Sequence, residues 1–348
     1  MKALLLRRRA WTFLVLAVML ASAQDGAAQE VSIRGTATDA ETGEPLRGVH
    51  VFLDQTTRGT TSSDQGTFEI APVPPGQYRV VASMVGYATE VRDVEVVPEV
   101  RAYQIDYEMA SSVVELVGIE VETDRPVAWE RNLRLFERNF IGTSSNAELT
   151  EIRNPYAMDF RILDEVFTAR APVPIVIVNR ALGYRLTVEL VQYRGSAAML
   201  QMAGRVRFEE LEPSSPSEAE RWKERRRATY EGSLMHFLRS LVDGSLRADG
   251  FVAEHELQFG YNIERVDLGA FPILEVTERP YLYRLFFDDE IVISYRGEVS
   301  RIRLTGDEAF IHSGGYVYGT GRAVPPVTVS GAMSIDRLAD ILPRDYGL

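Results

Sequence analysis

The chain contains no cysteine, only four histidines, and no long apolar run beyond its N-terminal segment. The absence of cysteine excludes disulfides, thiolate nucleophiles and cysteine-ligated zinc. Positive charge is also in short supply, because 38 basic residues face 50 acidic ones and the formal net charge is −12. A phosphate backbone is bound through a basic surface, so this balance argues against a nucleic-acid partner. No later run approaches the roughly 18 apolar residues of a membrane span, so no transmembrane helix is expected in the mature chain.

The first 23 residues have the features of a secretory signal peptide. Lys2 and the arginines at positions 7–9 supply a positive start, residues 10–20 form a short apolar run, and residues 21–23 (Ala-Ser-Ala) offer a cleavage site. Residues 26–28 are a second cleavage option, and an uncleaved N-terminal anchor is the alternative reading. Because no cysteine follows the apolar run, a lipid-anchored lipoprotein is excluded. We expect export, with residues 1–23 removed and 24–30 left as a polar connector.

Short apolar runs separated by Gly, Pro and Asp begin at Val31. Their alternation is that of strands with one buried face, and no helical period interrupts them. Strands are expected at residues 31–33, 50–53, 67–70, 78–83, 90–97 and 102–109, with a further one at 113–121. Six or seven short strands bounded by turn residues predict an all-β sandwich or barrel. Residues 124–126 (Asp-Arg-Pro) are the expected boundary with a second domain.

Three stretches of this segment have a distinctive spacing, at residues 35–53, 59–70 and 74–87. Their landmarks are turn glycines, apolar strand residues and acidic turn residues, among them Gly35, Asp39, Gly43, Pro45, Gly48, Val51, Asp64, Gly66, Phe68, Gly76, Tyr78, Gly86 and Tyr87. This pattern resembles the carboxypeptidase-regulatory-like domain, a transthyretin-like β-sandwich common in exported proteins of the Bacteroidetes and related bacteria. The resemblance implies a seven-stranded Ig/transthyretin-like sandwich over residues 31–122. It does not imply hydrolysis, because this module accompanies the zinc peptidase domain of metallocarboxypeptidases and does not itself cleave.

The remaining residues, 127–348, are expected to form a β-rich α+β domain with two or three helices. One helix is predicted by an apolar stripe and ends near Gly142; the stripe consists of Trp129, Leu133, Phe136 and Phe140. Residues 173–178 are typical of a buried strand, and 184–193 with 199–208 of an antiparallel hairpin. This region is similar to the C-terminal part of many bacterial proteins that carry the same N-terminal module, a similarity that brings no catalytic residues.

A second helix is predicted over residues 217–242. Ser217 is its expected N-cap, Glu220 lies at the capping-box position, and Gly244 follows its end. Strand-like runs continue to residue 318, and a short helix over 334–342 is expected to close the chain.

No motif for catalysis or metal binding is found. None of the four histidines lies in an HxxE or HExxH pattern, so we expect no metal, no cofactor and no peptidase chemistry. Ser233 and His236 lie three residues apart, which on a helix could make a nucleophile and its base. That pair lacks a nucleophile elbow and an orienting third group, so we expect no catalytic residue.

Two turn segments could instead present a ligand surface. Asn before Pro, or close to Gly, is a turn device, and a tyrosine exposed beside such a turn can contact a ligand. Tyr156 follows an Asn-Pro pair, while Asn179 and Tyr184 flank the turn at Gly183. These three residues are the candidate ligand or partner contacts, against the simpler interpretation that they only shape the turns.

The sequence therefore predicts a non-enzymatic exported protein, periplasmic or associated with the outer membrane, that acts as a binding or scaffolding module. Its partner would be an envelope protein or an outer-membrane receptor, reached through free strand edges. Two alternatives stay open: an accessory component of a TonB-dependent uptake system, and a hydrolase with a site in residues 127–348.

Overall fold

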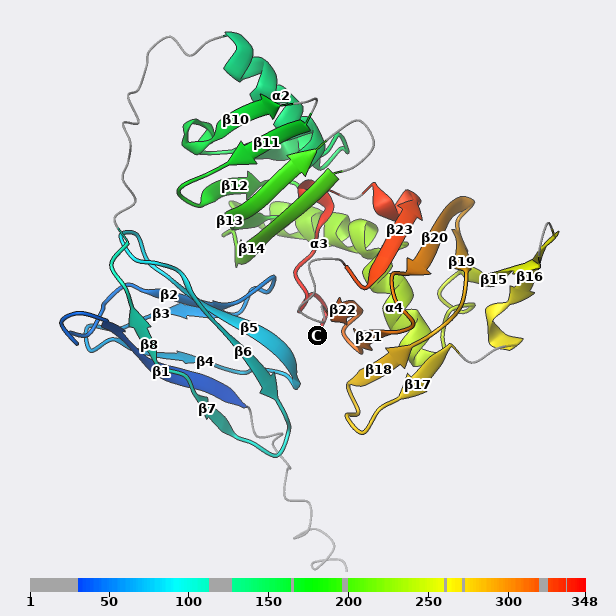
Figure 1. Ribbon diagram of the computed structural model, residues 1–348, viewed down its shortest axis with the longest axis horizontal. Coiled ribbons are helices and arrows are strands. Elements are labelled where there is room, and N and C mark those ends of the chain that lie inside the picture. The colour runs from blue at the N-terminus through cyan, green and yellow to red at the C-terminus, as the bar shows by residue number, and fades with distance from the viewer. Residues whose placement is uncertain are drawn as a thin grey trace, which may run out of the picture.

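The N-terminal part of the chain is a sandwich of two four-stranded sheets (Figure 1). The computed structural model describes residues 31–112, 127–163, 166–195, 200–259, 262–270, 273–318, 325–335 and 337–348. The expected signal segment, connector, strand at 113–121 and boundary at 124–126 lie outside these residues. One sheet contains β1 (Ser32–Asp39), β4 (Thr67–Ile70), β7 (Ala102–Gln104) and β8 (Tyr107–Met109). The other runs in the order β3-β2-β5-β6, formed by β3 (Gly59–Thr61), β2 (His50–Leu53), β5 (Gly76–Ser83) and β6 (Glu90–Val96).

The sandwich has eight described strands where seven were expected. The run expected at 102–109 is split into β7 and β8, because the Asp106 carboxylate accepts hydrogen bonds from both the amide and the hydroxyl of Thr36, each at 2.8 Å. The neighbouring Ile105 carbonyl presses on β1, where a Cβ at Gly35 would lie 1.7 Å from that oxygen. Strand β3 had no apolar signal, since its sequence is Gly-Thr-Thr.

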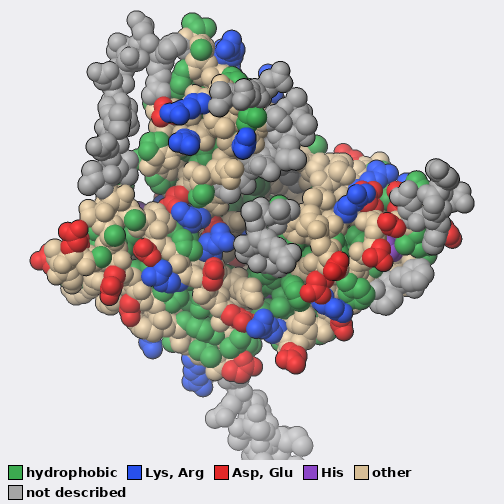
Figure 2. Space-filling model, in the orientation of Figure 1, with side chains coloured by type: hydrophobic (Ala, Val, Ile, Leu, Met, Phe, Trp, Pro, Cys, Tyr) green, Lys and Arg blue, Asp and Glu red, His purple; other side chains and the backbone are tan. Residues whose placement is uncertain are grey.

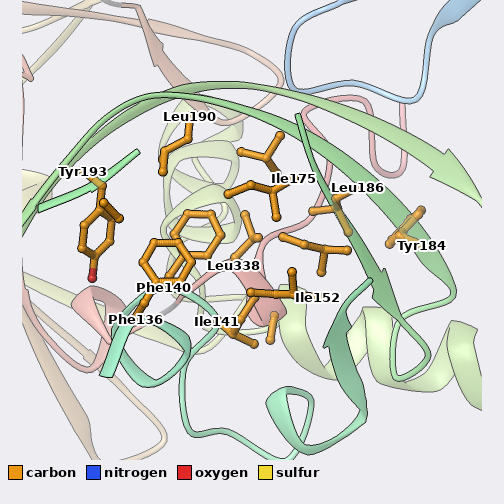
Figure 3. Close-up of a cluster of buried hydrophobic side chains, with 14 of the residues drawn as sticks. Phe136, Phe140, Ile141, Ile152, Ile175, Tyr184, Leu186, Leu190, Tyr193 and Leu338 are labelled. Carbon is orange, nitrogen blue, oxygen red and sulfur yellow. The ribbon is translucent and has the colours of Figure 1, made fainter. Parts of the chain in front are cut away.

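After the sandwich comes a six-stranded sheet, which we call the second sheet. One of its faces is covered by the predicted helix, α2 (Val127–Phe140). Its order is β10-β11-β13-β12-β9, with β14 paired to β13. The bounds are β9 (Thr150–Ile152), β10 (Asp159–Leu163), β11 (Val166–Arg170), β12 (Ile175–Asn179), β13 (Tyr184–Gly195) and β14 (Leu200–Glu210). The predicted hairpin is confirmed as the β13–β14 pair, whereas the β10–β11 hairpin had no prediction. Phe136 and Phe140 of α2 stack at 4.6 Å over this sheet, beside Tyr193 (Figure 3).

The predicted helix over 217–242 is in fact two helices, α3 (Pro216–Tyr230) and α4 (Leu234–Asp243). Gly232 separates them with a φ of +84°, and a side chain there would meet the Tyr295 ring at 2.6 Å. The N-cap is Ser215 rather than Ser217, because Pro216 fits the first helical position and the Ser215 side chain accepts from the third amide beyond it. Gly244 ends α4 in the left-handed conformation, as predicted.

The rest of the chain forms two more sheets packed around α4. One has the order β16-β15-β19-β20-β23 and the other β17-β18-β21-β22. Their bounds are β15 (Phe251–Phe259), β16 (Asn262–Asp267), β17 (Leu274–Val276), β18 (Leu282–Leu285), β19 (Glu290–Tyr295), β20 (Glu298–Leu304), β21 (Ala309–His312), β22 (Tyr316–Tyr318) and β23 (Val327–Gly331). Phe237 and Leu238 of α4 are buried in the shared core. The fold is therefore mainly β, as predicted.

The expected closing helix is replaced by short 3₁₀ turns, which include η4 (Ala332–Ser334) and η5 (Leu338–Asp340). Tertiary partners take the backbone groups that a helix would use. The Ala339 amide donates to the Ile141 carbonyl at 3.1 Å, and the Ala339 carbonyl accepts from the Asn179 side chain at 2.9 Å. In the described ranges, no helix combines the length and apolarity needed to cross a membrane.

The sandwich is joined to the second sheet through the loop between β2 and β3. The Gln55 amide donates to the Val206 carbonyl at 2.8 Å, and the Phe208 amide donates to the Thr56 carbonyl at 3.2 Å. The buried Asp54 carboxylate accepts from the Val206 amide at 2.8 Å. The loop therefore occupies the outer edge of β14 as an added strand would.

The C-terminal segment closes the same loop from its other side. The Asp345 carboxylate accepts from the Thr57 amide at 3.0 Å and from its hydroxyl at 2.7 Å, and lies 3.5 Å from the Arg58 guanidinium. The Arg344 amide donates to the Gln55 carbonyl at 2.8 Å. In Figure 1 the C-terminus lies where the sandwich, the second sheet and the β21–β22 hairpin meet. We call this set of contacts around the β2–β3 loop the joint.

One face of the sandwich is also buried beside the joint. Phe52 and Val81 are register partners whose neighbours along β2 and β5 fill the sandwich core, so both face outward. They are nevertheless 4% and 0% exposed. On one side of them, the Ser83 hydroxyl donates to the Glu189 carboxylate of β13 at 2.7 Å. Figure 2 shows acidic and basic side chains interspersed with hydrophobic ones over one face of the molecule.

A buried histidine ties the sandwich to the β21–β22 hairpin. His312 Nδ1 accepts from the Gly314 amide at 2.7 Å, which places the ring proton on Nε2, 3.1 Å from the Pro75 carbonyl it donates to. The ring stacks on Tyr316 at 4.5 Å. Burial lowers the pKa of His312 to about 4, against the opposing effect of the Pro75 hydrogen bond. The neutral ring is therefore the form that fits this contact.

Replacing Asp345 by Ala is expected to lower the free energy of unfolding by about 2–3 kcal/mol, because its partly buried carboxylate accepts two charge-assisted hydrogen bonds from Thr57 and lies beside Arg58. Urea denaturation measures this, and amide exchange should accelerate at Thr57. Asp64→Ala is the matched control, since its ion pair with Arg47 is exposed and contributes about 0–1 kcal/mol. Equal stability of the two variants would contradict the role given to the joint.

Stability should also depend on His312 at acid pH. Its pKa falls from an ordinary 6.5 to about 4 in the folded chain, so the unfolded chain takes up the proton first. The contribution of neutral His312 to stability is then fully present above pH 6.5 and is lost as pH falls to about 4. This loss lowers the free energy of unfolding by about 3 kcal/mol. Denaturation from pH 7.5 to 4 should show a smaller loss for His312→Gln than for the natural chain. Parallel curves for the two proteins would refute the assignment.

Candidate binding site

An open cavity of about 610 Å³ lies where the segment after α2 and the end of α3 meet the turn between β19 and β20. Its walls come from the segment after α2, the end of α3, the α3–α4 loop, the β19–β20 turn and the two 3₁₀ turns near the C-terminus. Its volume is within the range of ligand-binding sites, which often form where separate parts of a fold meet. No single segment of sequence builds it.

One wall is a polar cluster centred on Asn146, which is 8% exposed. The Asn146 amide donates to the Asp340 carboxylate at 2.9 Å and to the Thr229 hydroxyl at 3.1 Å. Its carbonyl oxygen accepts from the Arg225 guanidinium at 3.3 Å. Asp340 also accepts from the Ser144 hydroxyl at 2.9 Å. Because both polar groups of the Asn146 side chain are engaged, this wall is held in one arrangement before any ligand arrives.

The opposite wall is the tight turn between β19 and β20. Arg296 and Gly297 take φ values of +50° and +90°, the conformation of a two-residue hairpin turn that usually begins with Asn, Asp or Gly. An arginine is costly at this position. Here its guanidinium donates to Glu231 at 2.8 Å, and Glu231 also pairs with Arg227 at 3.6 Å. The turn thus fixes the α3–α4 loop at the rim of the cavity.

The Ser233 hydroxyl and the His236 ring do not form the hydrogen bond that a nucleophile and its base would need. Ser233 is the N-cap of α4, and its hydroxyl oxygen accepts from the His236 backbone amide at 3.2 Å. The His236 ring accepts from the Gly232 amide through Nδ1 at 3.1 Å and packs on Phe251 at 4.8 Å. Burial lowers the pKa of His236. Both side chains are engaged in ending one helix and starting the next.

The three predicted contact residues are not brought together. Asn179 is 1% exposed, and its side chain bonds the Ala339 carbonyl and the Leu182 amide, each at 2.9 Å. Tyr184 is 2% exposed beneath the Arg226 guanidinium, which lies 4.0 Å from its ring centroid. Both are therefore interior residues that hold their turn. Tyr156 is 62% exposed and stacks on Trp129 at 5.5 Å, away from the cavity lining.

No set of three or more His, Asp or Glu side chains within the described ranges is arranged to hold a metal ion. No role was predicted for the cavity residues Asn146, Arg296 and Asp340. Arg225 lies in a run of basic residues typical of a solvated helix face, and the other three lie in unrelated segments. The one local signal was Arg-Gly in a hairpin turn, a position that seldom carries arginine.

Comparison with known proteins identifies one part of the chain. Residues 32–109 match the family model of the carboxypeptidase regulatory-like domain. A search of curated proteins finds no match. The chain is similar to BcpA, the major pilin subunit of Bacillus cereus, with 13% identity and a TM-score of 0.22 over 24% of this chain and 31% of that one.

The group B streptococcus pilus 2b backbone protein is also similar, with 16% identity, a TM-score of 0.21 and coverage of 26% and 43% of the two chains. A cohesin–X-dockerin complex from Acetivibrio cellulolyticus is similar as well, with 22% identity and a TM-score of 0.21 over 23% of this chain and 58% of that one. The chain thus spans less than two thirds of the length of each of these proteins, and at such TM-scores the family match carries the identification. The N-terminal β-sandwich of this chain is a carboxypeptidase regulatory-like domain, as its motifs predicted.

Proposed function

We propose that this chain is a non-enzymatic exported protein of the cell envelope, periplasmic or associated with the outer membrane, that acts as a binding module on a rigid scaffold. The observation that carries the proposal is the cavity, in which polar side chains from several segments converge on open space. Concave sites with a few fixed polar groups are the usual form of a ligand-binding site.

The joint supports the scaffolding half of this proposal. Main-chain bonds to β14, the Asp345 contacts and the buried Phe52–Val81 face hold the sandwich in one position. A partner that binds such an assembly loses little free energy in ordering it. The expected partner is an envelope protein, and an outer-membrane receptor of an uptake system is one form it could take.

Export is tested by producing the full chain with a C-terminal epitope in a Gram-negative host. A processed form cut within residues 21–28 and recovered from the periplasm or outer membrane is expected, because residues 1–23 have the charge and length of a signal peptide. Unprocessed protein that stays in the cytoplasm would count against export.

Scaffolding is tested by capture from envelope extracts with the mature protein as bait. A partner held by the natural chain and by Asp64→Ala, but held more weakly by Asp345→Ala, is the expected pattern. Equal capture by all three proteins would show that the joint has no part in binding.

Replacing Ser233 by Ala separates a capping role from hydrolysis. Loss of an N-cap side chain costs about 1 kcal/mol, so the thermal midpoint should fall. The same loss is not expected for the control Ser330→Ala, which changes an exposed serine of β23. Any turnover of p-nitrophenyl acetate should be the same for both variants and the natural chain. Turnover by the natural chain that disappears in Ser233→Ala would revive the hydrolase alternative.

A further inference from the structure

We infer that the cavity binds a small organic acid through a single carboxylate, with Arg225 as the anchoring cation. This inference rests on the proposed binding function and names the class of its ligand. It follows from which charges around the cavity are already satisfied.

Arg225 is a half-buried cation without an anionic partner. Its guanidinium donates to the neutral side-chain oxygen of Asn146 at 3.3 Å. Across the described ranges it forms no ion pair, whereas its helix neighbours Arg226 and Arg227 pair with Glu210 and Glu231. A guanidinium offers five N–H donors, so most of its donors stay available on the cavity side. Asn146 fixes its position from behind.

The carboxylates around the cavity limit the charge of the ligand. Glu231 is engaged by two arginines, and Asp340 accepts from two side chains. Glu298 lies at the rim and is exposed. The lining thus holds three carboxylates against two guanidiniums, and of these two only Arg225 lacks a carboxylate partner among the described residues. Three nearby carboxylates would repel a doubly charged phosphate more strongly than a singly charged anion. A monocarboxylate matches this field, and it can accept two parallel hydrogen bonds from one guanidinium.

The rest of the lining accepts an apolar body. Met333, the Tyr295 ring and the side chain of Ile335, which is 70% exposed, form one part of the wall. An isoleucine so exposed beside a cavity gains free energy when a ligand covers it. A ligand with one carboxylate and a compact aromatic or branched body therefore fits the cavity best.

Three probes that share a phenyl ring test the inference on the mature protein: benzoate, its neutral isostere benzamide, and phenyl phosphate. Side-chain arginine Nε–H signals are followed by NMR during each titration, with the Arg225 signal assigned from Arg225→Lys. Benzoate should shift that signal and bind at least about tenfold more tightly than benzamide or phenyl phosphate. A tenfold difference is the size expected for one charge-assisted hydrogen-bonding contact.

The variants separate the anchor from its helix. Arg225→Gln should abolish the preference for benzoate over benzamide, while Arg225→Lys keeps part of it. Arg221→Gln is the matched control, because Arg221 is exposed on the same helix and does not line the cavity. A thermal midpoint measured for each variant shows whether it is folded.

Equal binding of benzoate and benzamide would overturn the carboxylate inference and leave the cavity a binding site, so the proposed function would stand. Tighter binding of phenyl phosphate would replace the ligand class with a phosphate and also overturn the inference. Failure of all three probes to shift any cavity signal would overturn both the inference and the cavity as the binding site.

Discussion

The structure depends on one loop, that between β2 and β3, which is held on two sides by segments far apart in the chain. Its main chain continues the edge of β14, and Asp345 holds its far end. The loop also buries a charge, and burial raises the pKa of Asp54, an effect opposed by the Val206 amide and by Arg344 and Arg79. A buried carboxylate is tolerated only when such partners are present. The loop is therefore stable only when the sandwich, the second sheet and the C-terminal segment are assembled together.

This constraint changes how the N-terminal module should be regarded. A regulatory-like domain at the start of a chain suggests an independent domain joined to the rest by a linker, because its own residues form a complete hydrophobic core. The outward Phe52–Val81 pair shows otherwise, since two buried apolar side chains on an outer face would be exposed in an isolated sandwich. The module is thus part of a larger packed unit.

Sequence reasoning succeeded where local pattern determines structure and failed where distant contacts decide. The sandwich strands, α2 and the β13–β14 hairpin follow from apolar alternation or a helical stripe. The break at Gly232 exists because the Tyr295 ring occupies the space a side chain would need. The candidate site had no local motif, since its walls come from segments with unrelated patterns, and Asn179 and Tyr184 had turn signals that serve the interior.

The cavity and the joint share one short stretch of chain. Leu338 is buried in the core of the second sheet, Asp340 forms the cavity wall with Asn146, and Asp345 holds the β2–β3 loop. These three anchors lie within eight residues of the C-terminal segment. The segment that completes the cavity wall is therefore the same one that holds the sandwich, so the cavity is complete only when the C-terminal segment is in the place that also forms the joint.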